Sequence, residues 1–106
     1  MNVLFICSQN RLRSPTAEAV FAEYPGLAVD SAGLDRDAVN PLSPEQVEWA
    51  DAIVVMERRH RTKLEQFFRK HLNGQRVIVL DIPDRYSFMQ PELIAELRRK
   101  TFRFLG

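Results

Sequence analysis

The chain has 106 residues, of which 45% are hydrophobic and 27% are charged, and its formal net charge is +1. These values are ordinary for a globular protein with one modest core. Its apolar runs are too short to span a bilayer, and its single cysteine excludes both an internal disulfide framework and a cysteine-cluster metal site. Met1 is followed directly by a predicted strand, without the pattern of a signal peptide. We therefore expect one complete, cytoplasmic domain over residues 1–106.

The charge is distributed unevenly along the chain. Residues 1–56 carry three basic and eight acidic side chains, whereas residues 57–106 carry twelve basic and six acidic ones. A basic half can indicate nucleic-acid binding. Here the basic residues lie mostly on the polar faces of two predicted helices, so we interpret them as a solvated surface. We predict neither a nucleic-acid nor a membrane partner.

The first predicted unit is a strand, a loop and a helix. The apolar run over residues 3–6 predicts a buried strand, and apolar positions within residues 16–24 repeat at helical spacing. Between them lies the segment of sequence CSQNRLRSP, residues 7–15. The only cysteine therefore lies at the carboxyl end of a strand, in a loop that leads into a helix.

The rest of the chain alternates strands and helices. Strands are predicted over residues 27–30, 52–56 and 76–80, and helices over residues 44–49, 59–72 and from residue 91 onward. Alternating elements with strands that are apolar throughout predict an α/β fold of three layers, with a four-stranded parallel sheet and helices on both faces. In such sheets ligands bind outside the carboxyl ends of the strands. The loops after the first, second and fourth strands should therefore share one functional edge.

The position of Cys7 suits a nucleophile. Backbone N–H groups and the helix dipole attract an anion there, and they favour a thiolate over a thiol. Arg13 can offer a planar fork of donors to a phosphate-like dianion, and Ser14 can donate a hydrogen bond to the sulfur. A lone cysteine beside an apolar strand is most often a small packing residue. The strand–loop–helix context nevertheless favours a phosphate-binding loop with Cys7 at its base.

We call residues 8–14 the anion loop. Its amides and Arg13 would hold the equatorial oxygens of a phosphoryl group in the transition state. The predicted phosphate-binding residues are Ser8, Gln9, Asn10, Arg11, Leu12, Arg13 and Ser14.

A leaving alkoxide or phenoxide also needs a proton, so a carboxylic acid must approach from another loop. Asp81 and Asp84 are the acids in the loop after the fourth strand. Asp84 lies further along that loop and reaches over the site more readily, whereas Asp81 lies at the strand end. We predict that Asp84 is the general acid and keep Asp81 as the alternative.

The histidines and the aromatic residues outside this loop are interpreted as structural residues. His60 and His71 lie on the predicted helix 59–72, away from the functional edge. Both are interpreted as surface residues without a metal role, because no cysteine or acidic partner shares their spacing. Trp49 and the phenylalanines are predicted to lie in the core.

The motif Cys7-x5-Arg13-Ser14-Pro15 resembles that of the low-molecular-weight protein tyrosine phosphatase family. The likeness continues over residues 3–7, 13–21, 30–34 and 50–56, which are similar to family segments in family order. The resemblance implies a phosphatase I-like fold with flavodoxin-like winding. It also implies hydrolysis through a phosphocysteine, without a metal or a cofactor.

The resemblance assigns roles to individual residues. It makes Cys7 the nucleophile and Arg13 the phosphate clamp, whereas Asn10, Ser14 and Ser31 shape the loop. The family's general acid lies in an Asp-Pro-Tyr motif, which here reads Asp84-Arg85-Tyr86. Cys7, Arg13 and Asp84 are therefore the expected catalytic residues, and Tyr86 is the expected wall of the substrate site.

The chain also departs from the family pattern. Gln9 replaces a glycine that usually lies two residues after the cysteine, and Arg11 adds a charge near the mouth of the loop. The segment between Gly33 and Leu42 is much shorter than in the family. It lacks the helix and the aromatic residue that usually form one wall of the phosphotyrosine slot.

Three functional hypotheses follow. The first is a phosphatase acting on a phosphorylated protein or a small aryl phosphate, as a monomer or weak dimer. The second is a non-catalytic phosphoryl-binding or regulatory module that keeps the anion loop. The third is an arsenate reductase that uses an external thiol, since the chain has no second cysteine for an internal thiol cascade.

Overall fold

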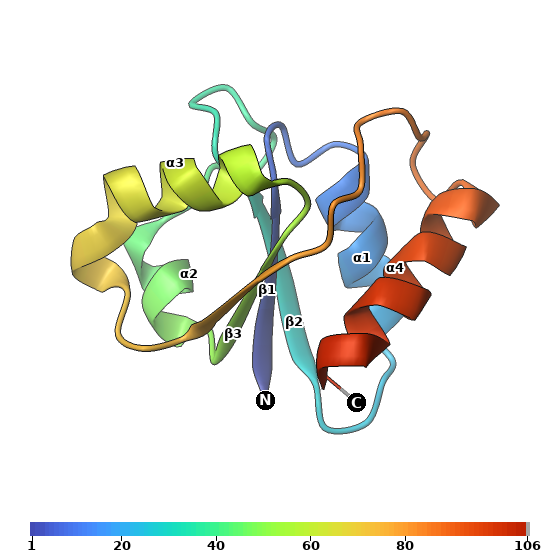
Figure 1. Cartoon of the computed structure of the whole chain (residues 1–106), viewed down its shortest axis with the longest axis horizontal. Coiled ribbons are helices and arrows are strands. Elements are labelled where there is room, and N and C mark those ends of the chain that lie inside the picture. Colours follow the sequence, from blue (N-terminus) through green and yellow to red (C-terminus); the bar gives the residue numbers. More distant parts are fainter. Residues whose placement is uncertain (106) are drawn as a thin grey trace.

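The computed structural model describes residues 1–105 and shows a sheet with helices on both sides (Figure 1). Among these residues, none of the helices combines the length and the apolar character that a membrane span requires. In chain order the elements are β1 (Asn2–Cys7), α1 (Arg13–Phe21), β2 (Ala28–Gly33), α2 (Pro44–Trp49), β3 (Ala52–Val55), α3 (Arg58–Phe68), the 3-10 helix η1 (Arg69–His71), β4 (Arg76–Val79) and α4 (Pro91–Leu105).

The four strands form one sheet in the order β2-β1-β3-β4, and every neighbouring pair is parallel. This order is that of a flavodoxin-like winding, with β1 at the point where the strand order reverses. The register aligns Cys7 with Gly33 across β1 and β2, and Val55 with Val79 across β3 and β4. The carboxyl ends of all four strands therefore meet at one edge, and the predicted fold class is confirmed.

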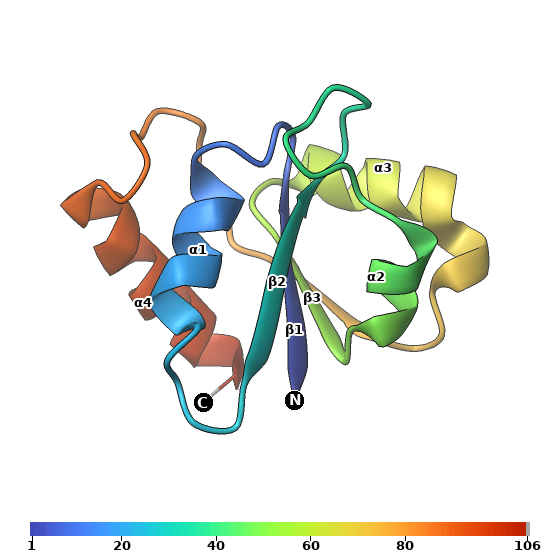
Figure 2. The same ribbon diagram turned by 180° about the vertical axis from the view of Figure 1, so that it is seen from behind.

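Side chains of β1 alternate between two cores, one on each face of the sheet. Val3, Phe5 and Cys7 pack with α1 and α4, whereas Leu4 and Ile6 pack with α2 and α3. Figure 2 shows the same two layers from behind, with α1 and α4 on one side of the strands and α2 and α3 on the other. Burying such an aliphatic or aromatic side chain stabilises the fold by about 1.5–3 kcal/mol. Both cores therefore anchor β1, which carries the cysteine.

Some element limits differ from the sequence prediction. The first helix begins at Arg13 rather than at residue 16, since the Thr16 N–H already donates to the Leu12 carbonyl at 3.2 Å. The helix ends at Phe21, and the Tyr24 N–H then donates to the Phe21 carbonyl at 3.1 Å. The predicted helix 59–72 divides into α3 and η1. The consequence for the site is that Arg13 belongs to the first turn of α1.

The prediction that Trp49 and all phenylalanines are core residues is wrong in part. Phe5 and Phe21 are fully buried and stack with ring centroids 5.5 Å apart. Phe67, by contrast, is 65% exposed, and Trp49 is 36% exposed. The helix face that holds Leu64 is the one buried against the sheet, and Phe67 lies three residues further along α3 on its margin. Hydrophobic character alone therefore overestimated the width of the buried face.

Candidate active site

The anion loop connects the end of β1 to the first turn of α1, at the functional edge of the sheet (Figure 1). Asn10 adopts the left-handed conformation, with φ of 56°, which asparagine tolerates better than most residues. This reversal lets the loop turn back over Cys7, whose side chain is only 3% exposed. The loop thus has a buried sulfur at its base.

The segment that follows β2 supports the outer side of the loop. The N–H groups of Asp35 and Val39 donate to the carbonyls of Ser8 and Gln9, at 3.0 and 2.9 Å. A Cβ on Gly33 would lie 2.6 Å from the Ser8 carbonyl oxygen, so only glycine allows this approach. Because the loop carbonyls face this segment, the short connection over residues 34–42 helps to hold the anion loop in shape.

A buried chain of hydrogen bonds reaches the sulfur. The Asn10 side-chain amide donates to the Ser14 hydroxyl oxygen at 2.8 Å, and that oxygen lies 3.0 Å from the Cys7 sulfur. Since the Ser14 oxygen accepts from Asn10, its own proton is available to the sulfur. The other acceptor within reach is the Ala32 carbonyl, at the longer distance of 3.4 Å. Ser14 can therefore stabilise negative charge on Cys7.

The same chain continues away from the sulfur toward β2 and α1. Asn10 also donates to the Ser31 hydroxyl oxygen at 3.0 Å, and Ser31 donates to a carboxylate oxygen of Glu18. Both Asn10 and Ser31 are buried. These residues lie behind the loop rather than at its open side, an arrangement that suits support of the loop.

Arg13 is held in one position by two acceptors. Its guanidinium is 2% exposed, and Nη1 donates to Glu57 Oε2 and to the Ile82 carbonyl, at 2.5 and 2.7 Å. The guanidinium of Arg59 and, to a lesser extent, that of Arg13 lower the pKa of Glu57 to about 2, against the opposing effect of partial burial. Glu57 is therefore an ionised counter-ion for a buried arginine at neutral pH.

A small pocket of about 160 Å³ opens above the sulfur. Asp84 lies at this pocket, with Oδ1 3.7 Å from Arg13 Nε and with 54% of its side chain exposed. Asp81 is not among the residues that line it, and the Asp81 carbonyl accepts from Lys100 Nζ at 2.9 Å. The structure therefore brings Asp84, rather than Asp81, to the anion loop. The residues that line the pocket are Cys7, Ser8, Gln9, Arg11, Leu12, Arg13 and Asp84.

Tyr86, the predicted wall of the substrate site, does not line this pocket. Its ring is half-buried and packs against the core between the sheet, α1 and α4. The Arg85 guanidinium lies over that ring, 5.6 Å from its centroid. Leu12 and Arg11 of the anion loop are among the residues that do line it. The predicted catalytic residues are thus brought together, whereas the predicted wall is not.

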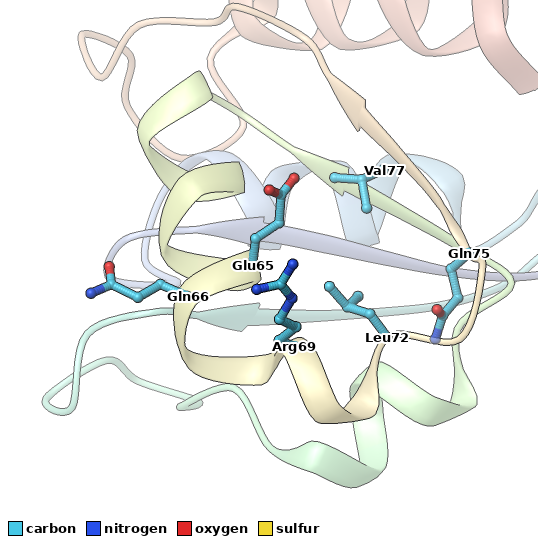
Figure 3. Close-up of a pocket in the computed structure, with 6 residues that line it drawn as sticks. All are labelled: Glu65, Gln66, Arg69, Leu72, Gln75 and Val77. Carbon is cyan, nitrogen blue, oxygen red and sulfur yellow. The ribbon is translucent and has the colours of Figure 1, made fainter.

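A larger groove elsewhere lacks suitable chemistry. It has a volume of about 650 Å³ and lies between α3, η1 and the start of β4 (Figure 3). Figure 3 shows the Glu65 carboxylate and the Arg69 guanidinium on its helical side and Val77 on its strand side. None of its six lining residues is a cysteine, serine or histidine. We therefore place the functional site at the smaller pocket.

Sequence reasoning missed two residues of the site, Glu57 and His60. The prediction that His60 is a surface residue is wrong, since its side chain is 1% exposed. The Glu57 N–H donates to His60 Nδ1 at 3.0 Å, and His60 Nε2 lies 3.0 Å from the Ser8 hydroxyl oxygen. Burial, assisted by the positive charges of Arg13 and Arg59, lowers the pKa of His60 to about 4. The histidine is therefore neutral near pH 7.

The signal that could have found both residues is their place after β3. Glu57 follows Met56 at the carboxyl end of that strand, on the edge where ligands bind in parallel sheets. The loops after the other three strands were predicted to lie at this edge, whereas the loop after β3 was not.

Comparison with known families agrees with the loop motif. Residues 2–41 match the family model described as low molecular weight phosphotyrosine protein phosphatase. This range includes the anion loop and Ser31, so the predicted resemblance is confirmed over the N-terminal part of the chain. No curated protein sequence matches the chain.

Solved structures extend the likeness to the whole fold. The YwlE arginine phosphatase from Geobacillus stearothermophilus matches with a TM-score of 0.76 and 21% identity, over 98% of this chain and 92% of its own. The tyrosine phosphatase Wzb from Escherichia coli K30, in complex with phosphate, matches with a TM-score of 0.77 and 19% identity, over 97% and 94%. SP-PTP, a low molecular weight protein tyrosine phosphatase from Streptococcus pyogenes, matches with a TM-score of 0.77 and 13% identity, over 99% and 93%. At these identities the likeness is one of fold.

Proposed function

We propose that this chain, whose anion loop and fold are those of the low molecular weight protein tyrosine phosphatases, is a cysteine-dependent phosphomonoester hydrolase. One observation carries the proposal. A buried thiol, a buried arginine and an exposed carboxylate, those of Cys7, Arg13 and Asp84, line the same small pocket. These are the nucleophile, the anion clamp and the acid that phosphoryl transfer through a covalent intermediate requires.

In the first step the Cys7 thiolate attacks phosphorus. For a phosphomonoester, the sulfur–phosphorus bond forms while the phosphorus–oxygen bond to the leaving group breaks, and Asp84 gives its proton to the departing oxygen. For phosphoarginine, the bond that breaks is phosphorus–nitrogen, and the proton goes to the departing nitrogen. The Ser14 hydroxyl, 3.0 Å from the sulfur, supports this role because it can stabilise the thiolate before attack and again when the sulfur leaves.

In the second step water attacks the phosphocysteine. The Asp84 carboxylate accepts a proton from the water, the sulfur–phosphorus bond breaks, and inorganic phosphate and the thiolate are released. One carboxyl group thus serves as acid and then as base. Its position at the open side of the pocket, with 54% exposure, suits contact with a leaving group and with water.

Arg13 holds the phosphoryl oxygens together with the backbone N–H groups of the anion loop. A guanidinium has five N–H donors. Glu57 and the Ile82 carbonyl take the two on Nη1, so those on Nη2 and Nε remain for the phosphoryl group. The ion pair with Glu57 fixes the plane of the guanidinium before substrate binds, which lowers the cost of ordering it.

We propose a small aryl phosphate or a phosphorylated protein side chain as substrate. The pocket volume of about 160 Å³ is suited to a phosphoryl group and little more, and Leu12 supplies an apolar wall beside it. The neighbouring structures include phosphatases named for tyrosine and for arginine. A substrate panel with phosphotyrosine, a phosphomonoester, and phosphoarginine, a phosphoramidate, therefore distinguishes the two substrate classes.

The test is hydrolysis of para-nitrophenyl phosphate by the purified protein, followed by phosphotyrosine and phosphoarginine peptides. We expect turnover that inorganic phosphate inhibits competitively and that Cys7→Ser abolishes. Activity retained by Cys7→Ser would overturn the proposal. A protein that binds phosphate but hydrolyses none of these substrates would instead be a phosphoryl-binding module, and arsenate-dependent oxidation of an added thiol would identify a reductase.

A further inference from the structure

Ser8 differs from the other residues of the anion loop because its hydroxyl lies within hydrogen-bond distance of a buried histidine. Its side chain lines the pocket beside Cys7 and Arg13. On its other side, the hydroxyl oxygen lies 3.0 Å from His60 Nε2. Among the described residues 1–105, the Ser8 hydroxyl has no other side-chain partner.

The hydrogen bonds determine where the histidine carries its proton. His60 Nδ1 faces the backbone N–H of Glu57 at 3.0 Å, and a backbone N–H can only donate. In the neutral imidazole, Nδ1 is therefore the acceptor and Nε2 carries the hydrogen. The Nε2–H then donates to the Ser8 oxygen, since the nearest Glu57 carboxylate oxygen is further away, at 4.0 Å.

This assignment leaves the Ser8 proton free. Because the serine oxygen accepts from His60, its own O–H points away from the ring, and the open direction is the pocket that Ser8 lines. A phosphoryl oxygen in that pocket is a strong acceptor, and hydrogen bonds to charged groups are the stronger class.

We propose that the Ser8 hydroxyl donates a hydrogen bond to a phosphoryl oxygen and that neutral His60 is the positioning residue that sets the direction of this donor. The inference rests on the proposed function, in that it requires a phosphoryl group above Cys7. It gives the anion loop a side-chain donor in addition to its backbone N–H groups and Arg13. It also links α3 to substrate binding.

The surroundings of His60 favour its neutral form. Arg13 and Arg59 oppose its protonation, whereas Glu57 and Asp35 favour it by a smaller amount, and burial opposes it most strongly. A doubly protonated ring would place a proton on Nδ1 against the Glu57 N–H. His60 does not line the pocket, so it acts through Ser8 rather than on the substrate.

The first experiment measures inorganic phosphate binding by calorimetry, which needs no turnover. We expect Ser8→Ala to weaken binding by on the order of tenfold to hundredfold, and Ser8→Thr, which keeps the hydroxyl, to retain affinity within about threefold. Ser8→Ala with wild-type phosphate affinity would overturn the inference. Thr62→Ala serves as the α3 control, because Thr62 is exposed and, within residues 1–105, its hydroxyl bonds only to the Arg58 carbonyl.

The second experiment tests the part played by His60. We expect His60→Gln, whose amide nitrogen can donate in place of Nε2, to bind phosphate better than His60→Leu. The effects of His60→Leu and Ser8→Ala should be less than additive, since His60 acts through the donor that Ser8→Ala removes. If His60→Leu does not fold, nitrogen NMR of the wild-type imidazole decides, and a proton on Nδ1 rather than Nε2 would contradict the proposal.

The two proposals fail separately. Hydrolysis by Cys7→Ser would overturn the catalytic proposal and leave the phosphate-binding measurements standing. Cys7-dependent hydrolysis with a Ser8→Ala variant equal to wild type in phosphate affinity would overturn only the role of Ser8.

Discussion

Arg13 is a charged residue that is 2% exposed, and a buried guanidinium is costly unless a counter-ion and acceptors compensate it. Glu57 and the Ile82 carbonyl provide that compensation on Nη1. The arrangement also prevents the guanidinium from turning away from the pocket. At the scale of single residues, stability and the proposed phosphate binding therefore depend on the same ion pair.

Glu57→Gln should weaken both properties. An amide keeps the shape but loses the charge, so the buried guanidinium is left uncompensated, and we expect the free energy of unfolding to fall by about 1–3 kcal/mol. We also expect kcat/KM to fall by on the order of tenfold to hundredfold, since Arg13 is less well fixed. Urea unfolding and steady-state kinetics measure the two effects. Glu65→Gln removes the exposed partner of Arg61 and is the matched control, expected to stay near wild type in both.

Asp84→Asn tests the general acid, and Asp81→Asn is its control. Proton donation matters most when the leaving group is basic. We expect Asp84→Asn to lower kcat by about 100-fold or more on an alkyl or unactivated aryl phosphate, and by less on para-nitrophenyl phosphate. Asp81→Asn should leave kcat close to wild type because Asp81 does not line the pocket. The reverse ranking of the two variants would make Asp81 the acid.

At the scale of elements, the site depends on where helices begin relative to strand ends. The sequence predicted Cys7, Arg13 and Ser14 together because they lie on one strand–loop–helix unit with a recognisable motif. It missed Glu57 and His60 because the loop after β3 was not assigned to the functional edge. The contact itself arises because α3 begins at Arg58, three residues after β3 ends, so its first turn lies against the anion loop. Such a contact depends on the packing angle between elements, which local sequence patterns do not encode.

Local sequence patterns also do not determine how much of a helix face is buried or which path a loop takes. The apolar runs of the strands and the alternation of strands with helices predicted the sheet, because both are patterns within short stretches of sequence. The exposure of Phe67 depends on how much of α3 the sheet covers, and the displacement of Tyr86 from the pocket depends on the path of the loop after β4. Both are set by tertiary packing.

Gly33→Ala tests the contact between the end of β2 and the anion loop. The added Cβ would lie 2.6 Å from the Ser8 carbonyl oxygen and 2.5 Å from Ala38 Cβ, so the backbone must shift. We expect a loss of about 1–3 kcal/mol in unfolding free energy and reduced phosphate affinity, measured by urea titration and calorimetry. Gly74→Ala is the control, because φ there is +82° in open space. It should cost about 1 kcal/mol without changing phosphate affinity. Unchanged phosphate affinity in Gly33→Ala would show that the loop does not depend on this contact.

At the scale of the whole molecule, the sheet separates two cores, and elements from both sides of the sheet contribute residues to the site. The core with α1 and α4 supports Cys7 from one face, and the first turn of α3 brings His60 to the loop from the other. His60 is buried in a position that favours the neutral ring, so protonation of this side chain opposes folding of the whole domain. The pH dependence of global stability therefore reports on a residue of the site.

The sign of that dependence follows from the pKa of His60, which folding lowers from 6.5 to about 4. The unfolded chain binds a proton on His60 below about pH 6.5, whereas the folded chain does so only near pH 4. The contribution of His60 to the free energy of unfolding should therefore be fully present above pH 6.5. It should fall as the pH decreases toward 4, by at most about 3 kcal/mol. Glu57, whose pKa is lowered to about 2, contributes to a further loss only at lower pH, below about 4.5.

Urea unfolding at pH 7, 6, 5 and 4.5 measures this slope in the wild type and in His60→Gln. The glutamine variant cannot take up a proton, so we expect its free energy of unfolding to change much less across this range. His71→Gln is the matched control, because His71 is partly exposed and pairs with Glu48 outside the site. If the slope persists unchanged in His60→Gln, the buried histidine does not control acid stability in this range. Burial of His60 between α3 and the anion loop would then have no measurable effect on the pH dependence of the free energy of unfolding.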